Sequence, residues 1–413
     1  MKILVYGINY YPELTGSGKY TSEACTGWVE MGHEVEVITT HPYYPAWRVS
    51  DDYRGKGWFT EQIAGVTVRR CPAFVPQKVT AVSRIALEVS FVFSSLVYWI
   101  PLLFKKKPDV LLVVSPPFQL GFMGFLFHLL TNTAWVYHIQ DLQVDIVHDL
   151  GMIRNRRLLR FLFACEKFLL TKATWVSTIS AGMQAKIVSK GIPSDKVLLF
   201  PNWVDTEKIF PSEVHLRVEL GYQPHDFIVQ YSGTIAEKQG LDQLIPVAQA
   251  LPRVQFMIVG EGGYKATLQA MVEAAGLSNI RFFPLQPYAR LSASLATADL
   301  HLVLQKRAAS DLVLPSKLTS ILAAGGCALV TAEPGTSLYT QIHEAQMGIL
   351  IEPESVEALI RGIQRAQVDD VSGYQTRARQ YAQQYLDKGP ILAHILKVLD
   401  PSQTNVLTSQ EFA

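Results

Sequence analysis

At 413 residues and 49% apolar content, the chain is long enough for two or more domains with sizeable hydrophobic cores. Its 37 basic and 36 acidic residues give a net charge of +1, so nothing in the composition suggests a nucleic-acid-binding protein. The four cysteines are scattered without metal-ligand spacing, so we expect reduced cytosolic thiols and no metal site.

Predicted strands and helices alternate through the first half of the chain, as in a parallel α/β domain. Residues 2–7 predict a buried strand, and residues 34–40 predict the next one. Gly16 and Gly18 lie between them, where they let a ligand approach the backbone at a helix N-terminus. They do not complete the dinucleotide fingerprint, and no suitably placed acidic residue follows the second strand. We therefore expect no nicotinamide site.

Residues 85–104 are mostly apolar and are followed by three lysines at 105–107. Glu88 and Pro101 interrupt this run, and the part between them is shorter than the roughly 20 residues that a membrane span needs. We therefore expect a buried or interfacial helix, with the lysines facing anionic lipid or water. This predicts a cytoplasmic protein with a peripheral contact on the cytoplasmic face of the membrane.

Polar side chains follow the predicted strand at residues 134–139, which contains His138 near its end. Asp141 and Asp145 come directly after it. Because ligands of open parallel sheets bind outside the carboxyl ends of the strands, Asp141 is a candidate site residue. A loop carboxylate that caps the next helix fits the same position equally well. His138 could share a catalytic role, and a structural histidine at a strand end is at least as well supported.

A second α/β series follows the Pro-Asn crossover at residues 201–202. Predicted strands at 227–231, 254–259 and 279–283 each lead into a loop that contains polar residues or glycine. These loops carry Gly233, Thr234, Lys238, Gln239, Gly260, Gly262, Gln286, Pro287 and Tyr288. Two α/β domains of similar size with such loops predict one binding cleft between them.

A further helix begins near Lys317 and ends at the two glycines of residues 325–326. Ser316 is its expected N-cap. The free N–H groups of such a helix start and the charge of Lys317 can together hold a diphosphate. From these residues alone, an ordinary capped helix is the more economical interpretation.

Short motifs follow one another in a characteristic order from residue 1 to about residue 399. They are Tyr10-Tyr11-Pro12-Glu13, Gly16-x-Gly18, Gln140-Asp141-Leu142, Pro201-Asn202-Trp203-Val204-Asp205, Tyr231-Ser232-Gly233, Lys238-Gln239-Gly240-Leu241-Asp242, Val259-Gly260-x-Gly262, Gln286-Pro287-Tyr288 and Leu314-Pro315-Ser316-Lys317-Leu318. In this order and spacing they resemble the retaining glycosyltransferases of family 4. Within that family the chain is most similar to the colanic-acid-type exopolysaccharide glycosyltransferases.

The resemblance implies an α/β protein of GT-B architecture, with two Rossmann-like domains facing across a deep cleft. Residues 1–200 would bind the acceptor and residues 201–380 the nucleotide sugar. Helices within residues 381–399 would cross back to the N-terminal domain, and residues 400–413 would form a frayed tail. The implied reaction moves a sugar, with retention, from a UDP- or GDP-linked donor to a lipid-linked or saccharide acceptor in cell-surface polysaccharide synthesis.

The resemblance also implies roles for particular residues. Lys238 and Lys317 would neutralise the diphosphate, so no metal and no cofactor beyond the co-substrate is expected. Asp141, with His138, would be catalytic. The implied donor-binding set is Gly16, Gly18, Gly233, Thr234, Lys238, Gln239, Gly260, Gly262, Gln286, Pro287, Tyr288, Asp311, Ser316, Lys317 and Leu318.

The chain departs from the family pattern at the donor site. Many members carry a Glu-x7-Glu pair, which here falls on Leu312 and Ser320, with Asp311 beside the first. The usual lysine before Gly240 is Gln239, so Lys238 would have to act from one position earlier. These changes leave open a non-catalytic member that binds a sugar nucleotide or a partner. A two-domain epimerase is a second alternative, but it would need more carboxylates and histidines near the sugar.

Overall fold

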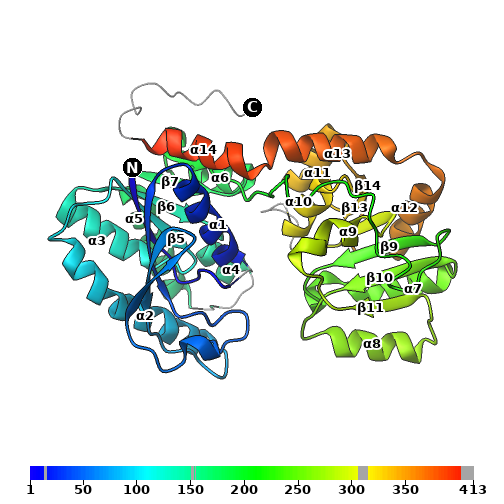
Figure 1. The fold of residues 1–413 in the computed structure, drawn as a ribbon, viewed down its shortest axis with the longest axis horizontal. Coiled ribbons are helices and arrows are strands. Elements are labelled where there is room, and N and C mark those ends of the chain that lie inside the picture. Colours follow the sequence, from blue (N-terminus) through cyan, green and yellow to red (C-terminus); the bar gives the residue numbers. More distant parts are fainter. Residues whose placement is uncertain (14–15, 150–152, 154, 306–314, 401–413) are drawn as a thin grey trace. The chain divides into compact units, whose positions relative to one another are not determined.

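The computed structural model describes residues 1–13, 16–149, 153, 155–305 and 315–400. The chain divides into two compact units. The N-terminal unit consists of Met1–Pro201 together with the chain from Leu392 onward, and the C-terminal unit consists of Asn202–Ile391. Each unit is built on its own sheet (Figure 1).

The N-terminal unit contains an eight-stranded sheet of order β3-β4-β2-β1-β5-β6-β7-β8. All neighbours in this sheet are parallel except β3 and β4. The strands are β1 (Lys2–Tyr6), β2 (Glu34–Thr40), β3 (Phe59–Ile63), β4 (Val66–Cys71), β5 (Val110–Ser115), β6 (Ala134–Ile139), β7 (Trp175–Thr178) and β8 (Val197–Leu199). Every residue of β5 is buried, as expected for a central parallel strand that is covered on both faces.

Helices cover both faces of this sheet. They are α1 (Gly16–Glu30), α2 (Ala81–Leu102), α3 (Leu120–Thr131), α4 (Gln143–Asp149), α5 (Arg156–Lys172) and α6 (Ala181–Ser189), with short 3-10 turns η1 (Asp51–Tyr53) and η2 (Ser194–Lys196). Figure 1 shows α1 on one side of the sheet and α2 and α3 on the other. The last helix, α14 (Lys388–Leu399), begins in the C-terminal unit and ends in the N-terminal unit. There Leu392 packs on α1 so closely that a Cβ at Gly27 would lie 2.5 Å from it.

Helix α2 is longer and more regular than the sequence predicts. Thr80 caps its start, and Pro101 lies in its last turn. Glu88 does not interrupt the outer face, because its buried carboxylate accepts a hydrogen bond from Gln119. Among the described helices of eighteen residues or more, α2 alone has the length and composition that a membrane crossing requires. One side of it nevertheless packs on the sheet through Phe91 and Trp99, as in the core helix of a globular domain.

The C-terminal unit contains a six-stranded parallel sheet of order β11-β10-β9-β12-β13-β14. Its strands are β9 (Phe227–Ser232), β10 (Val254–Val259), β11 (Ile280–Phe283), β12 (Leu300–Val303), β13 (Ala328–Thr331) and β14 (Ile349–Ile351). Alternate strand residues enter apolar clusters on opposite faces, for example Val229 and Tyr231 on one and Ile228 on the other. The sheet is therefore covered on both faces, which is the doubly wound arrangement.

The helices of this unit connect successive parallel strands, except for the last two, which follow β14. They are α7 (Leu244–Ala250), α8 (Lys265–Ala274), α9 (Leu291–Leu295), α10 (Ser316–Ala323), α11 (Ser337–Ala345), α12 (Val356–Val368) and α13 (Ser372–Tyr385), with 3-10 turns η3 (Glu237–Gln239), η4 (Leu241–Gln243) and η5 (Tyr288–Arg290). Both units thus have the parallel α/β organisation that the sequence predicts, and loops gather at the carboxyl edge of each sheet.

Candidate active site

Two glycine-containing loops pack against each other at the carboxyl edge of the C-terminal sheet. A Cβ at Gly260 would lie 1.9 Å from the carbonyl oxygen of Gly233, and a Cβ at Gly262 would lie 2.1 Å from that of Ile235. The Gly233 N–H donates to the Val259 carbonyl at 2.9 Å, which joins the two loops. The close approach that requires glycine here is therefore between two backbones. It brings together Gly233, Gly260 and Gly262, three residues of the predicted donor-binding set.

Lys317 points at this edge from the first turn of α10. Its Nζ lies 3.9 Å from the centroid of the Tyr231 ring and 3.5 Å from the position that a Cβ on Gly233 would take. This Nζ is buried and has no hydrogen-bond partner among the described residues. Burial lowers the pKa of Lys317 from its ordinary value to about 7. Because an unpaired buried ammonium is costly, the arrangement is suited to receive an anion.

The start of α10 differs from the prediction at one residue. Ser316 is the first helical residue and is exposed, whereas Pro315 holds the N-cap position and no side chain caps the helix. The expectation that Ser316 is the N-cap is therefore wrong. Leu318 is buried in the apolar cluster beneath the helix, so it anchors the helix and is not exposed to a ligand. The first turn keeps N–H groups that no side chain caps, next to the charge of Lys317.

The described donor residues that were predicted in the C-terminal unit lie around the same edge, whereas Gly16 and Gly18 belong to α1 of the N-terminal unit. The carbonyl of Thr234 accepts a hydrogen bond from the Tyr231 hydroxyl at 2.8 Å. Gln286, Pro287 and Tyr288 follow β11, next to the loop after β10, and Tyr288 is exposed. Gln239 ends the turn η3. The side chain of Lys238 and the whole of Asp311 lie outside the described residues.

A second set of polar residues surrounds a cavity of about 200 Å³ in the N-terminal unit. The walls come from the loops after β1, β2, β5 and β6 and from the starts of α1 and α2. The lining residues are Ile8, Asn9, Gly16, Ser17, Tyr43, Tyr44, Trp47, Arg84, Leu87, Glu88, Pro116, Pro117 and Asp141. Aromatic rings, carboxylates and an amide in one cavity suit a polyhydroxylated ligand such as a sugar. Of the two predicted catalytic residues, only Asp141 lies here. Gly16 also lines this cavity, and Gly18 lies two residues further along α1.

Glu13 holds the loops on two sides of this cavity together. Its Oε1 accepts hydrogen bonds from the backbone N–H groups of Tyr43 and Tyr44 at 2.7 and 2.6 Å. Its Oε2 accepts one from Asn9 Nδ2 at 2.8 Å. Burial raises the pKa of Glu13, and these donors act in the opposite direction. The sequence analysis includes Glu13 in a motif but assigns it no role, because the backbone groups of Tyr43 and Tyr44 that it binds are about thirty residues away.

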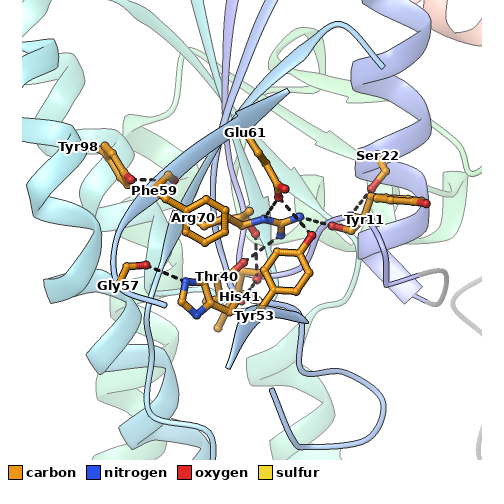
Figure 2. Close-up of polar contacts among 12 residues, drawn as sticks. Tyr11, Ser22, Thr40, His41, Tyr53, Gly57, Phe59, Glu61, Arg70 and Tyr98 are labelled. Carbon is orange, nitrogen blue, oxygen red and sulfur yellow. Dashed lines mark hydrogen bonds and ion pairs between the residues drawn. The ribbon is translucent and has the colours of Figure 1, made fainter. Parts of the chain in front are cut away.

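Figure 2 shows that Arg70 makes polar contacts with the same loops. The side chain is fully buried, and its Nε pairs with Glu61 Oε1 at 2.7 Å. Its Nη1 donates to the Thr40 carbonyl at 3.0 Å, and its Nη2 donates to the Tyr11 carbonyl. The ring of Tyr53 lies 5.1 Å from the guanidinium carbon. One side chain thereby fixes the ends of the loops after β1 and β2, and nothing in the sequence pattern marks it.

We expect Arg70→Lys to lower the free energy of unfolding by about 1–2 kcal/mol, because lysine keeps the charge but cannot reach the carboxylate and both carbonyls at once. Urea unfolding measures this change. Arg48→Lys is the matched control, since its pairing with Asp51 is exposed and should contribute less than about 0.5 kcal/mol. Equal stability of the Arg70 and Arg48 variants would show that these Arg70 contacts contribute nothing.

His138 does not reach the cavity. Its Nδ1 lies 2.9 Å from Ser177 Oγ, its Nε2 lies 2.8 Å from Gln140 Nε2, and its ring packs on Phe200. Burial lowers the pKa of His138 to about 3, so the imidazole is neutral at neutral pH. Both ring nitrogens are occupied by protein groups and the cavity does not include it. The structure corrects the catalytic interpretation in favour of the structural one.

Asp145 is also buried and does not line the cavity. It pairs with Lys186 at 3.3 Å and with Lys190, which also contacts Glu166. This charge cluster ties α4 to α5 and α6. Asp141 precedes α4 by two residues and stays exposed at the cavity, so its position depends on a helix that is firmly attached.

Family models match both units. One for a glycosyl transferase 4-like domain matches residues 15–203, and one for glycosyl transferases group 1 matches residues 215–385. A candidate colanic acid biosynthesis glycosyl transferase of Escherichia coli K12, WcaI, is 42% identical over 410 residues, which cover 96% of this chain and 99% of that protein.

Solved structures share the fold at low sequence identity. Sucrose-phosphate synthase from Thermosynechococcus elongatus aligns with a TM-score of 0.77 at 16% identity, over 96% of this chain and 98% of that one. The Anabaena protein HepE, in complex with UDP-glucose, aligns with a TM-score of 0.68 at 16% identity, over 97% and 99% of the two chains. These likenesses show the GT-B fold. With the identity to WcaI along almost the whole chain, they establish that this protein belongs to the family 4-like glycosyltransferases of GT-B fold.

Proposed function

We propose that this glycosyltransferase transfers a sugar, with retention and without a metal ion, from a nucleotide-diphosphate sugar to a lipid-linked acceptor in exopolysaccharide synthesis. The C-terminal unit holds the donor and the N-terminal unit holds the acceptor. The observation that carries the proposal is Lys317, a buried amine without a described hydrogen-bond partner at a helix start beside the glycine loops. The complex of HepE with UDP-glucose and the assignment of WcaI to colanic acid synthesis support the same donor class and pathway type.

The proposed grip on the diphosphate explains how the reaction proceeds without a metal. Departure of a nucleotide diphosphate leaves negative charge on the phosphate oxygens, which needs fixed positive charge nearby. Lys317, the first turn of α10 and, from the sequence, Lys238 would supply that charge. Within the described part of the chain, no three His, Cys, Asp or Glu side chains come together as metal ligands.

The position of helix α2 supports a lipid-linked acceptor in preference to a free saccharide. Arg84, Leu87 and Glu88 on its first turns line the cavity. The opposite side of the same helix is exposed and apolar, including Ile85 and Phe93. A cavity with an amphipathic helix as one wall suits a ligand with a polar head and an apolar tail. Arg84 would face the phosphate that joins sugar and lipid in such a ligand.

The proposed location is the cytoplasmic face of a membrane, with α2 lying in the interface. We expect part of the protein to sediment with membranes and to be released by high salt or carbonate, because only one side of α2 is free to contact lipid. Cell fractionation measures this. A requirement for detergent would show instead that the segment crosses the bilayer.

A thermal-shift screen against UDP-, GDP- and dTDP-sugars tests the proposed function directly. We expect one nucleotide class to raise the melting temperature by mass action, since it binds only the folded state. The sugar of the nucleotide sugar that raises the melting temperature should then be transferred to a lipid-linked acceptor with its anomeric configuration retained. Absence of any shift, with absence of transfer, would contradict the proposal.

A further inference from the structure

The exposed side of α2 carries an unbroken apolar stripe. Its members recur at helical spacing and are Val82, Ile85, Val89, Phe93, Val97 and Ile100, followed by Phe104 just beyond the helix. Phe93 is 67% exposed and Phe104 is 85% exposed. Large apolar side chains in a row on one helix face are unusual on a monomeric soluble protein, and they mark a contact surface.

Two further helices extend this surface. Helix α3 exposes Phe122, Leu126, Leu129 and Leu130, and α5 exposes Leu158, Phe161 and Phe168. Ring contacts hold the three helices together, with Trp99 of α2 at 5.0 Å from Phe127 of α3, and Phe125 of α3 at 5.1 Å from Phe168 of α5. The sequence analysis noted only α2. The neighbouring stripes become visible when α3 and α5 are placed beside it, and Figure 1 shows α2 and α3 on the same side of the sheet.

The charges on these helices have one sign. The structure describes α2, α3 and α5 completely, and their only acidic residues, Glu88 and Glu166, are both buried. Apart from Arg84, which lines the cavity on the other side of α2, the exposed charged residues of the three helices all lie on α5 and are basic, and three lysines follow α2; these residues are Arg156, Arg157, Arg160, Lys167, Lys172, Lys105, Lys106 and Lys107. The whole chain is almost neutral at +1, so positive charge is concentrated on this face.

We propose that the exposed face of α2, α3 and α5, called here the three-helix face, docks on a bilayer that contains anionic lipid. Apolar side chains enter the boundary between headgroups and acyl chains, and the arginines and lysines pair with lipid phosphates. The proposal extends the membrane contact of α2 in the proposed function. It names a partner, anionic phospholipid, and adds α3 and α5 to the contact.

The charge pattern also decides against a second copy of the chain as the occupant. In a two-fold dimer each patch meets itself, so these basic residues would face one another without a described carboxylate between them. An anionic surface removes that repulsion. Phospholipid also accommodates neighbouring apolar stripes without needing a complementary protein shape.

Vesicle flotation with the full-length protein tests the proposal, using phosphatidylcholine vesicles with and without phosphatidylglycerol. We expect Arg157→Gln combined with Arg160→Gln to weaken binding to the anionic vesicles by roughly 25-fold, at about fivefold for each charge removed. Leu129→Ser combined with Phe161→Ser should weaken binding to both kinds of vesicle. Val218→Ser and Arg361→Gln, at exposed positions of the C-terminal unit, are matched controls and should bind as the wild type does.

Three outcomes would overturn the three-helix face. The first is that the wild-type protein does not float with anionic vesicles, and the second is that the docking variants bind vesicles as well as the control variants do. The third is that light scattering shows a wild-type dimer and shows monomers for the docking variants. Calorimetry with the nucleotide sugar separates this test from that of the proposed function. The docking variants should keep the wild-type donor affinity, because Leu129, Arg157, Arg160 and Phe161 line neither site. Loss of vesicle binding with unchanged donor affinity supports the face even if the acceptor proves to be different.

Discussion

Replacing Lys317 by alanine should weaken binding of the nucleotide sugar by roughly 1.5–3 kcal/mol, the contribution of a charge-assisted hydrogen bond to phosphate. The Nζ is buried against Tyr231 with no described partner, so a diphosphate would provide the anion that it lacks. Titration calorimetry measures the affinity. Lys208→Ala is the control, since its ammonium pairs with Asp205 on the surface of the same unit and should not affect the donor.

The same interaction should depend on pH in a defined direction. Burial places the pKa of unliganded Lys317 at about 7. A bound diphosphate stabilises the ammonium and raises this pKa, so binding takes up a proton, and donor affinity falls as the pH rises above 7. Calorimetry in buffers of different ionisation enthalpy detects that proton, and Lys317→Ala should abolish its uptake.

Lys317 should also reduce the stability of the unliganded protein. In the unfolded chain its pKa is 10.5, so the unfolded state binds the proton more tightly than the folded state does. The resulting cost grows as the pH falls from 10.5 and is complete below about 7. Lys317→Met should therefore raise the melting temperature at neutral pH, and the gain should shrink as the pH rises toward 10.5. Donor binding provides the test of the proposed diphosphate contact. If both Lys317→Ala and Lys238→Ala keep the wild-type donor affinity, these two lysines do not bind the diphosphate.

The apolar strands could be located from the sequence because burial on both faces gives continuous apolar runs. The predictions for 34–40, 134–139 and 254–259 coincide with β2, β6 and β10. The antiparallel edge strand β3 was not predicted, since Phe59–Ile63 has three consecutive polar residues between its two apolar ends and therefore lacks a strand pattern. Helix α11 was also missed, because only Leu338 and Ile342 of its nine residues are buried.

Some residues of the candidate site are positioned by their sequence neighbours, and others are positioned by contacts with residues far away in the sequence. Lys317 and the glycine loops could be predicted, because a helix start and a loop at a strand end are set by neighbouring residues. Glu13 and Arg70 could not, since their partners at Tyr43 and Tyr11 are brought near only by the sheet. His138 shows the converse error. It stands near the predicted strand end, but its side chain contacts Ser177 of the neighbouring strand β7 and does not reach the cavity.

Replacing Asp141 by asparagine should lower turnover by about 100-fold or more, the usual contribution of a placed acid–base or polar group in the transition state. Retaining transfer requires the acceptor hydroxyl to approach on the face from which the phosphate leaves. A donor phosphate oxygen can accept the hydroxyl proton there, so the protein has mainly to orient the acceptor. If the N-terminal cavity holds the acceptor as proposed, a carboxylate there would hold the acceptor hydroxyls and stabilise positive charge that develops on the transferred sugar.

The structure allows this role to be separated from a structural one. Asp141 is exposed and lines the cavity, whereas Asp145, four residues later, is buried in an ion cluster with Lys190. Asp141→Asn should therefore change turnover and leave donor affinity and melting temperature almost unaltered. Asp145→Asn should do the reverse, because it leaves the Lys186 and Lys190 ammonium groups short of a partner and loosens α4. Steady-state kinetics, calorimetry and thermal unfolding of the two variants distinguish the roles. Near-wild-type turnover in Asp141→Asn, or a lower melting temperature as its only effect, would return Asp141 to the function of a loop carboxylate.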